Sequence, residues 1–316
     1  MKSGQKPVKT RVLVTGGAGF IGSHLVDCLV SDGYKVAVID NLSTGNRKNL
    51  NPRAKFYKLD IANKKVDEVF HREKPEIVFH LAAQVDLQKS ILDPVADAKT
   101  NILGFINICK NCKKYGVKKI VFSSSAAVYG DNGCIPAKED SPLQPVSPYG
   151  VAKLTAENLL DIYQKQFGID YVALRYSNVY GPKQGSNGEG GVVSIFFKKA
   201  KSGEKLCIYG NGEQTRDFIY VDDVVGANLS AIQGSQTGIF NISTAKETSI
   251  NELFEIVNNL VGGKATKQYL PARSGDQARS ALDYSKAAQF LSWRSKYTLQ
   301  EGLSNTSKWF LRTKKA

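Results

Sequence analysis

A glycine-rich turn near the start of the chain constrains the fold more than any other stretch. The β-rich run 11–15 is followed by "GGAGFIG" and then by an amphipathic stretch over 21–31. Gly16, Gly19 and Gly22 permit a tight turn and let the backbone approach a ligand closely, and the N–H groups of a helix that begins here favour phosphate. A strand, a glycine turn and a helix in this order predict a dinucleotide-binding site.

The residue that ends the second β-rich run indicates which dinucleotide is bound. "KVAVID" ends at Asp40, eighteen residues after Gly22. A carboxylate at this place accepts hydrogen bonds from a ribose diol and repels a 2′-phosphate. We therefore expect NAD rather than NADP. The alternative is that Asp40 is an ordinary solvated turn residue.

Strands and helices alternate through the first half of the chain. Strands are expected at 11–15, 35–40, 54–60, 75–83, 117–126 and 169–178, and helices at 21–31, 63–74, 93–116 and 147–168. Alternation of this kind builds right-handed βαβ units. It predicts an α/β fold with a doubly wound parallel sheet, the Rossmann arrangement.

The second half of the chain has shorter elements. Helices are expected near 192–202, 221–233, 249–261 and 298–312, and a strand near 205–209. We expect an NAD-binding Rossmann domain over 1–176, with a return segment near 216–242. The remaining residues, 177–316, are expected to form a smaller α/β substrate-binding domain.

Charge and hydropathy limit the partners and the location of the protein. With 43 Lys and Arg against 29 Asp and Glu, the net charge is +14, which permits a nucleic-acid partner. The lysines are dispersed and no nucleic-acid module motif is present, so we do not expect a nucleic-acid partner; a basic field also attracts an anionic small substrate.

No apolar run reaches the ~18 residues of a membrane helix. Because no apolar signal core follows the basic N-terminus, we expect a cytoplasmic protein without membrane contact.

Five cysteines are scattered along the chain, and only Cys109 and Cys112 are close in sequence. They are either a redox or metal pair or two small apolar residues on one helix face. With no second C-x-x-C and three histidines, the second interpretation is favoured. We expect no metal site.

"SPYGVAK" places Tyr149 and Lys153 four residues apart, just after Pro148. Residues at this spacing share a helix face, and Pro148 suits the first helical position. A free phenol has a pKa of about 10, so a base near pH 7 needs a downward shift of roughly 3 units. The Lys153 ammonium, the helix N-terminus and a positively charged nicotinamide together supply such a shift. Ser125, at the end of a strand, is expected to hydrogen-bond the same substrate oxygen; the alternative is a surface helix with an ordinary Tyr and Lys.

With these residues in place, the chain resembles the extended short-chain dehydrogenase/reductase family, and within it the nucleotide-sugar epimerases of the UDP-glucose 4-epimerase type. The resemblance covers about residues 10–310. It is carried by "TGGAGFIGSH", "VIDNLSTG", "LDI", "FHLAAQ", "TNILGF", "FSSSAAVYG", "SPYGVAK", "LRYSNVYGP", "YGNGEQTRDFIYVDDV" and "RSGDQARSALDYSKA". It implies a homodimer built from two helices at about 93–115 and 148–168.

The resemblance also implies roles for residues at matching positions. The catalytic residues are Ser125, Tyr149 and Lys153. NAD contacts are implied at Gly16, Gly19, Phe20, Ile21 and Gly22 for the pyrophosphate, Asp40 and Asn41 for the adenosine ribose, Asp60 and Ile61 for the adenine, and Leu81, Ala82, Ala83, Asn101, Ser123, Tyr149, Lys153 and Tyr176 for the nicotinamide half. UDP-sugar contacts are implied at Gln84, Ser125, Asn178, Tyr209, Arg216, Arg273, Asp276 and Ser280. Two arginines on a diphosphate form bidentate charged hydrogen bonds; the alternative for Arg216 is a pair with Asp217.

The resemblance implies NAD-dependent 4-epimerisation of a UDP-hexose through a transient 4-keto sugar. Dehydratases and decarboxylases of this scaffold carry a carboxylate after the active-site serine, where this chain has Ala126 and Ala127. Ser280 stands where a bulky tyrosine restricts N-acetyl sugars, so UDP-N-acetylhexosamines are expected beside UDP-glucose and UDP-galactose. Two alternatives remain: another nucleotide-sugar enzyme (decarboxylase, dehydratase or reductase), and a protein that senses NAD or nucleotide sugars without turnover.

Overall fold

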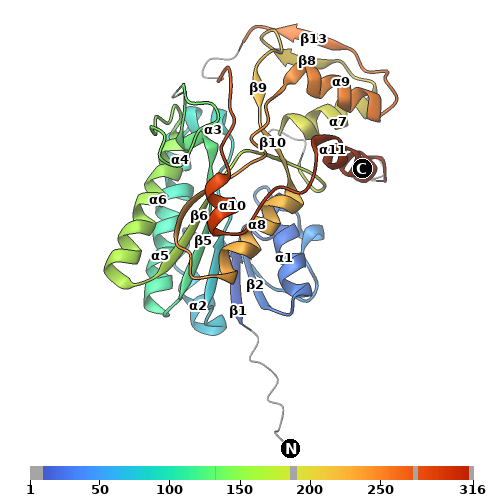
Figure 1. Ribbon diagram of the computed structural model, residues 1–316. Coiled ribbons are helices and arrows are strands. Elements are labelled where there is room, and N and C mark those ends of the chain that lie inside the picture. The colour runs from blue at the N-terminus through green and yellow to red at the C-terminus, as the bar shows by residue number, and fades with distance from the viewer. Residues whose placement is uncertain (1–9, 132, 186–190, 273–276, 313–316) are drawn as a thin grey trace, which may run out of the picture.

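Seven parallel strands form the main sheet of the computed structural model, which describes residues 10–131, 133–185, 191–272 and 277–312 (Figure 1). Their order is β11-β6-β5-β4-β1-β2-β3, and every neighbouring pair is parallel. The strands are β1 (Arg11–Thr15), β2 (Lys35–Asp40), β3 (Lys55–Lys58), β4 (Ile77–His80), β5 (Lys119–Ser125), β6 (Asp170–Tyr176) and β11 (Gly238–Ile242). The predicted doubly wound α/β class is confirmed.

Helices cover both faces of this sheet. One face carries α2 (Val66–Glu73), α5 (Phe105–Lys114) and α6 (Pro148–Phe167), and the other carries α1 (Phe20–Ser31) and α8 (Val221–Gln233) (Figure 1). Alternate residues of one strand therefore enter two cores: Val12 and Val14 pack with α1 and α8, whereas Leu13 packs with α2 and α5. Burial on both faces explains why these strands read as almost continuous apolar runs.

The predicted helix over 147–168 is confirmed as α6. The Ser147 hydroxyl accepts the Gly150 N–H at 3.1 Å, and Pro148 occupies the first turn, as expected for a helix start. The helix ends at Gly168, whose φ of 68° is left-handed, a conformation that glycine adopts without strain. These signals fix where α6 begins and ends.

The predicted helix over 93–116 is more complicated than expected. Asp93 caps it as expected, accepting the Ala96 N–H at 2.9 Å. The chain then forms α4 (Pro94–Ala98), a π-helix (Lys99–Gly104) and α5, one after another. A further short helix, α3 (Leu87–Leu92), precedes them and was not predicted. Because π-helical segments displace the residues that follow, they often occur at functional sites.

A second, smaller lobe lies beyond the carboxyl ends of the main strands (Figure 1). Its elements are α7 (Val192–Ser202), β8 (Leu206–Tyr209), α9 (Ile250–Leu260), β13 (Lys267–Leu270) and α11 (Leu299–Arg312). Short strand pairs complete it: β7 (Asn178–Tyr180) with β10 (Phe218–Tyr220), and β9 (Thr215–Arg216) with β12 (Thr248–Ser249). The helices and β8 match the prediction, whereas β13, parallel to β8, was not predicted.

Two later segments of the chain pack with the main sheet. Val224 of α8, Phe240 of β11 and Trp293, just after α10 (Ser285–Phe290), share one buried cluster with strand residues such as Val14. The sequence predicted α8 as a helix, but neither β11 nor α10. The division into an NAD-binding domain over 1–176 and a substrate-binding domain over 177–316 stays a prediction.

Candidate active site

The glycine turn lies at the carboxyl end of β1, where it leads directly into α1. The turn is closed by the Gly19 N–H, which donates to the Gly16 carbonyl at 3.1 Å. A Cβ on Gly22 would lie 2.1 Å from that carbonyl oxygen, and a side chain on Gly16, with φ of 73°, would lie 2.7 Å from the Ala82 nitrogen. Only glycine therefore allows this close packing, which leaves backbone N–H groups at the start of α1 to meet a phosphate. The turn fits a dinucleotide pyrophosphate.

Asp40 is not a solvated turn residue. It is 7% exposed at the end of β2, and its carboxylate accepts the Ala18 N–H at 2.9 Å and the Leu42 N–H at 2.8 Å. These bonds hold the carboxylate against the glycine turn, where a ribose diol is expected. The neighbouring Asn41 donates to the Asp60 carboxylate at 2.8 Å, so the two residues predicted beside the adenosine are linked.

The segment after β4 begins the wall predicted for the nicotinamide half. Leu81, Ala82 and Ala83 follow His80, and the Ala82 N–H donates to Thr15 Oγ1 at 3.2 Å. Thr15 Oγ1 also lies 2.9 Å from His80 Nδ1. Burial lowers the pKa of His80 to about 3, so this histidine is neutral at physiological pH and serves as a hydrogen-bonding group in the wall.

Asn101 and Gln84 are held by each other and by Asp97. Asn101 Oδ1 accepts the Gln84 N–H at 2.9 Å, and Asn101 Nδ2 donates to the Gln84 carbonyl and to Asp97 Oδ1, each at 2.9 Å. Gln84 Nε2 also donates to Asp97 Oδ1 at 2.9 Å. The Gln84 amide is thus engaged inside the chain, which gives its predicted substrate contact no geometric support. Asp97, 2% exposed, was missed, although its spacing four before Asn101 was a usable signal.

Tyr149, Lys153 and Ser125 meet at the carboxyl end of β5. The Ser125 hydroxyl interacts with the Tyr149 phenol and lowers its pKa, and Ser125 Oγ accepts the Ala127 N–H at 3.2 Å. Lys153 Nζ donates to the Ser123 carbonyl at 2.7 Å and lies 4.8 Å from the centre of the Phe122 ring. Tyr149 is 9% exposed and Lys153 is 4% exposed, so both are withdrawn from bulk water. The alternative of an ordinary surface Tyr and Lys does not fit this burial.

Burial dominates the acid–base properties of both groups in the protein alone. Burial raises the pKa of Tyr149 to about 12. The Ser125 hydroxyl opposes this shift, whereas the negative charge of Asp97 adds to it. Burial lowers the pKa of Lys153 to about 8, and the charges of Asp97 and Glu157 oppose this shift. The Tyr149 shift is opposite in direction to the one predicted for the complete site with its cofactor. The difference comes from the burial of the phenol, which the spacing of Tyr149 and Lys153 does not reveal.

Ser123 and Tyr176 belong to a buried chain of hydroxyls behind Lys153. Their oxygens lie 3.2 Å apart, and the Asn228 amide donates to the Tyr176 oxygen at 2.8 Å. Burial raises the pKa of Tyr176 to about 12. Asn228, from α8, is fully buried and was not predicted; one more polar residue in a helix that already contains Asp, Ser and Gln gave a weak signal.

The residues predicted to bind the sugar nucleotide lie mostly in the smaller lobe. Asn178 is exposed in β7, while Tyr209 and Ser280 are half-buried. Arg216 Nη1 donates to the carbonyls of Thr215 and Gln277, at 2.7 and 2.8 Å. Arg273 and Asp276 lie outside the described residues, so their positions relative to this group are not given.

The Asp217 carboxylate does not form the ion pair with Arg216 that was the alternative interpretation of Arg216. That carboxylate is fully buried and accepts the Thr244 N–H and hydroxyl and the Ala245 N–H at 2.7 to 3.0 Å. Its role is to fix the loop beside Arg216.

Cys109 and Cys112 both lie in the buried core that α5 forms with the sheet. Burial raises the pKa of both thiols, which makes them poor thiolates. Within the described residues there is no group of three or more side chains suited to a metal. None of the helices that the structure describes is long and apolar enough to cross a membrane.

Comparison with known proteins points to one family. Residues 12–243 match the NAD dependent epimerase/dehydratase family. The UDP-glucose 4-epimerase of Thermotoga maritima, solved with UDP-glucose, is 46% identical, with a TM-score of 0.94 over 96% of this chain and 99% of that one. The Thermus thermophilus UDP-glucose 4-epimerase, solved with NAD, is 39% identical, with a TM-score of 0.92 over 96% of this chain and 100% of that one.

A third similar structure is that of an epimerase named for a different sugar. The UDP-N-acetylglucosamine 4-epimerase of Methanobrevibacter ruminantium, solved with UDP-N-acetylmuramic acid, is 38% identical, with a TM-score of 0.91 over 96% of this chain and 99% of that one. The family match over residues 12–243 spans the glycine turn, Asp40 and the helix that carries Tyr149 and Lys153. The chain belongs to the NAD dependent epimerase/dehydratase family of extended short-chain dehydrogenases/reductases.

Proposed function

We propose that this protein is an NAD-dependent 4-epimerase that interconverts UDP-glucose and UDP-galactose. The observation that carries the proposal is the convergence of Ser125, Tyr149 and Lys153 in a buried site at the carboxyl ends of the strands. This is where a doubly wound sheet binds its ligands. Similarity to UDP-glucose 4-epimerases over 96% of the chain supports the same reaction.

In the proposed reaction Tyr149 accepts the proton of the sugar 4-hydroxyl while Ser125 hydrogen-bonds the same oxygen. NAD, when bound, supplies the group that takes the C4 hydride and returns it. The 4-keto sugar turns over about its diphosphate link, and Tyr149 then gives its proton back to O4 on the other face. Lys153 holds the cofactor ribose and favours the phenolate with its charge. The sum of the steps is redox-neutral, so the cofactor stays bound.

Tyr149 needs help to act as a base near pH 7, since its pKa in the protein alone is about 12. The help must come from positive charge close to the phenol. Lys153 is one turn away on the same helix face, and its ammonium lies 5.6 Å from the centre of the Tyr149 ring. A bound oxidised nicotinamide would be the second cation. It would add positive charge to that of Lys153, so Tyr149 would lose its proton more easily in the oxidised holoenzyme.

We further propose that UDP-N-acetylhexosamines are accepted beside the hexoses. Ser280 is small and half-buried, and the similar Methanobrevibacter ruminantium enzyme is named for an N-acetylated sugar. For the diphosphate, the proposed ligands are Asn178, Arg216 and Arg273. Ala126 and Ala127 offer no carboxylate for dehydration or decarboxylation.

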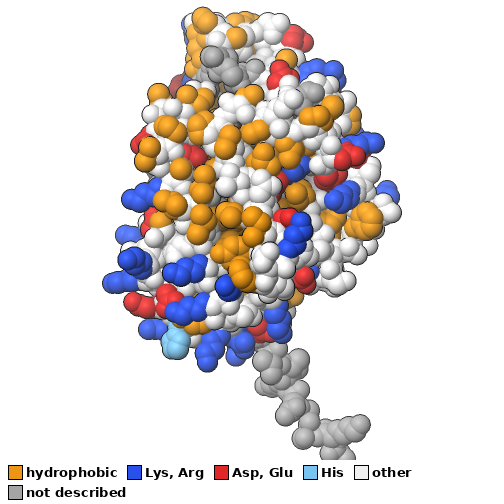
Figure 2. Space-filling model, turned by 90° about the vertical axis from the view of Figure 1, so that its left-hand side faces the viewer, with side chains coloured by type: hydrophobic (Ala, Val, Ile, Leu, Met, Phe, Trp, Pro, Cys, Tyr) orange, Lys and Arg blue, Asp and Glu red, His pale blue; other side chains and the backbone are white. Residues whose placement is uncertain are grey.

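We also propose that the protein is a homodimer and that the second copy covers α4 to α6. Figure 2 faces this side of the molecule and shows hydrophobic side chains gathered on it. They include Val95, Leu103, Val151 and Ile162, which are 78%, 59%, 47% and 49% exposed. An apolar area of this kind marks an interaction surface.

Activity is tested with purified protein and UDP-galactose, without added cofactor. We expect UDP-glucose to form without net NADH production, and Tyr149→Phe to reduce kcat by at least ~100-fold while UDP-sugar binding persists. Isothermal titration with UDP measures that binding independently. Net NADH production, or unchanged turnover in Tyr149→Phe, would refute the proposed reaction or the proposed base.

A further inference from the structure

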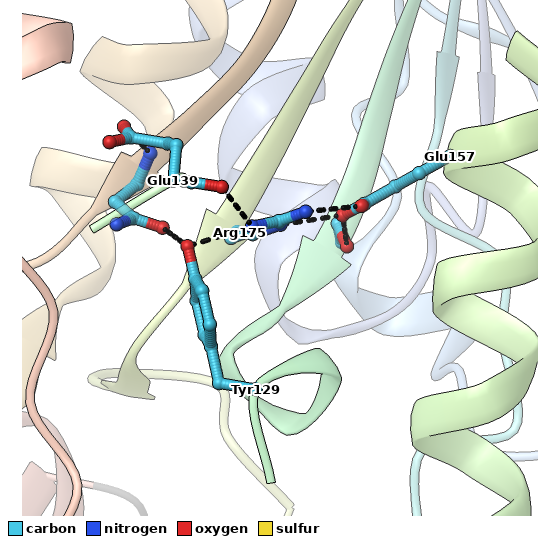
Figure 3. Close-up of polar contacts among 6 residues, drawn as sticks. Tyr129, Glu139, Glu157 and Arg175 are labelled. Carbon is cyan, nitrogen blue, oxygen red and sulfur yellow. Dashed lines mark hydrogen bonds and ion pairs between the residues drawn. The ribbon is translucent and has the colours of Figure 1, made fainter. Parts of the chain in front are cut away.

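A buried ion pair joins α6 to β6 behind the catalytic residues (Figure 3). Arg175 Nη2 and Nε donate to the two carboxylate oxygens of Glu157 at 2.7 and 2.9 Å, and both side chains are 1% exposed. Arg175 Nη1 also donates to the Tyr129 hydroxyl at 2.8 Å and to the Glu139 carbonyl at 3.3 Å. The arginine is therefore held on every side, and it fixes the carboxylate in one position.

The same carboxylate contacts the serine run at the end of β5. Ser124 Oγ donates to Glu157 Oε1 at 2.5 Å. The residues on either side of Ser124 carry the predicted chemistry: the Ser123 carbonyl accepts from Lys153 Nζ, and the Ser125 hydroxyl meets the Tyr149 phenol. One carboxylate thus spans the strand that presents the serines and the helix that presents Tyr149 and Lys153.

Glu157 lies on the same face of α6 as the proposed catalytic pair. It follows Lys153 by four residues and Tyr149 by eight, so the three side chains stand one turn apart along the helix. We propose that Glu157 is a positioning residue for the epimerase reaction: its carboxylate fixes α6 against the Ser123–Ser125 run and supplies negative charge that favours the ammonium form of Lys153. This inference rests on the proposed function.

The charge matters because Lys153 is buried. Burial lowers its pKa to about 8, while Asp97 and Glu157 raise it. The titratable groups that act on or contact Lys153 are His80 on β4, Asp97 on α4, and Tyr149 and Glu157 on α6. On β6, Arg175 pairs with Glu157 and Tyr176 contacts Ser123. The histidine and both tyrosines are neutral at pH 7, so the two carboxylates oppose the loss of the proton. Lys153 must stay protonated to favour the phenolate.

The first experiment follows kcat against pH for the wild-type protein and for Glu157→Gln. Loss of the Lys153 proton gives the alkaline limb of the profile, with a midpoint expected near pH 8. Removing an adjacent negative charge makes that proton easier to lose, so we expect the midpoint to fall by about one pH unit. The KM for UDP-galactose stays unchanged, because Glu157 is buried behind the site.

Glu157→Gln leaves Arg175 as a buried unpaired charge, which can prevent folding. The double variant Glu157→Gln/Arg175→Gln removes that problem, and its midpoint should fall in the same direction but less. Glu157→Asp keeps the charge and should restore the wild-type midpoint. Glu73→Gln makes the same chemical change on α2, far from Lys153, and should leave the midpoint unmoved.

A measurement without turnover separates this inference from the proposed function. The Lys153 side chain is titrated by NMR in lysine-labelled protein with its bound cofactor, and Lys153→Met assigns the signal. We expect the Lys153 pKa to be about one unit lower in Glu157→Gln than in the wild type. Equal values in the wild type, Glu157→Gln and the double variant would overturn the inference, whatever the enzyme assay shows. A wild type without sugar interconversion would overturn the proposed function alone.

Discussion

At the scale of single residues, the cofactor turn depends on the missing side chain of Gly22. A Cβ there would lie 2.1 Å from the Gly16 carbonyl oxygen, and backbone cannot move away as a flexible side chain can. We predict that Gly22→Ala opens the turn, so that the purified protein contains less than about a tenth of the wild-type NAD, a loss worth about 1.4 kcal/mol or more. Extraction of the cofactor and its measurement by chromatography give the result.

Gly226 provides the matched control for Gly22, because it also lies in a helix. The nearest atom to a Cβ on Gly226 is Trp293 Nε1 at 3.7 Å, an ordinary contact. Alanine favours helix over glycine by up to about 1 kcal/mol. Gly226→Ala should therefore keep its NAD and unfold at the same or a higher temperature. Equal NAD content in both variants would mean that the turn does not hold the cofactor.

Some site residues could be predicted from the sequence because they lie close together on one helix, whereas others come from separate strands and could not. Tyr149 and Lys153 were predicted because a four-residue spacing places two side chains on one helix face. The same rule, continued for one turn, reaches Glu157. Its partners could not be predicted in this way, since Ser124 and Arg175 come from neighbouring strands. Their meeting depends on the β5–β6 register, in which Ser124 lies opposite Arg175.

At the scale of elements, Lys119 joins the start of β5 to the end of α8. It is 8% exposed, and its ammonium donates to the carbonyls of Gly234, Gln236 and Ala231 at 2.8, 3.2 and 3.3 Å. The last carbonyls of a helix have no partner within it, so this side chain caps α8. We predict that Lys119→Met lowers the free energy of unfolding by about 1–3 kcal/mol, as measured by urea denaturation.

Lys118 is the neighbouring control. Its side chain is 76% exposed and reaches Glu76 at 3.6 Å, and surface pairs of this kind contribute about 0–1 kcal/mol. Lys118→Met should therefore change the free energy of unfolding by less than the Lys119 variant, with kcat unaffected in both. If the two variants unfolded at the same urea concentration, Lys119 would not act as a cap.

Helices and strands were predicted well where the pattern of their own residues specifies them. They were predicted poorly where contact with a segment distant in sequence determines their structure. The alternating strands and the capped helix α6 follow from local pattern. β11 is a five-residue run, "GIFNI", that becomes a strand of the main sheet because the chain returns to pair with β6. The π-helix at 99–104 was likewise not predicted, since its Asn101 is held by the backbone of Gln84, which is distant in sequence.

At the scale of the whole molecule, one side remains apolar after folding. Leu103 lies in the π-helix at 99–104 and Ile162 lies on α6; they are 59% and 49% exposed. Figure 2 faces the side of the molecule that these helices form. A buried charge without a partner is costly. We therefore predict that Leu103→Asp and Ile162→Asp convert the proposed homodimer to monomers at micromolar concentration, as light scattering measures directly.

Leu311 supplies the matched control for these two substitutions. It is 55% exposed, near the end of α11 in the smaller lobe, away from the α4–α6 side. Leu311→Asp should leave the dimer mass unchanged, because the same charge there remains in water. The glycine turn, Asp40 and Lys153 are held in place by contacts within one chain, so each monomer should keep its NAD. A monomeric wild type, or dimers that survive both substitutions, would show that α4–α6 is not the interface.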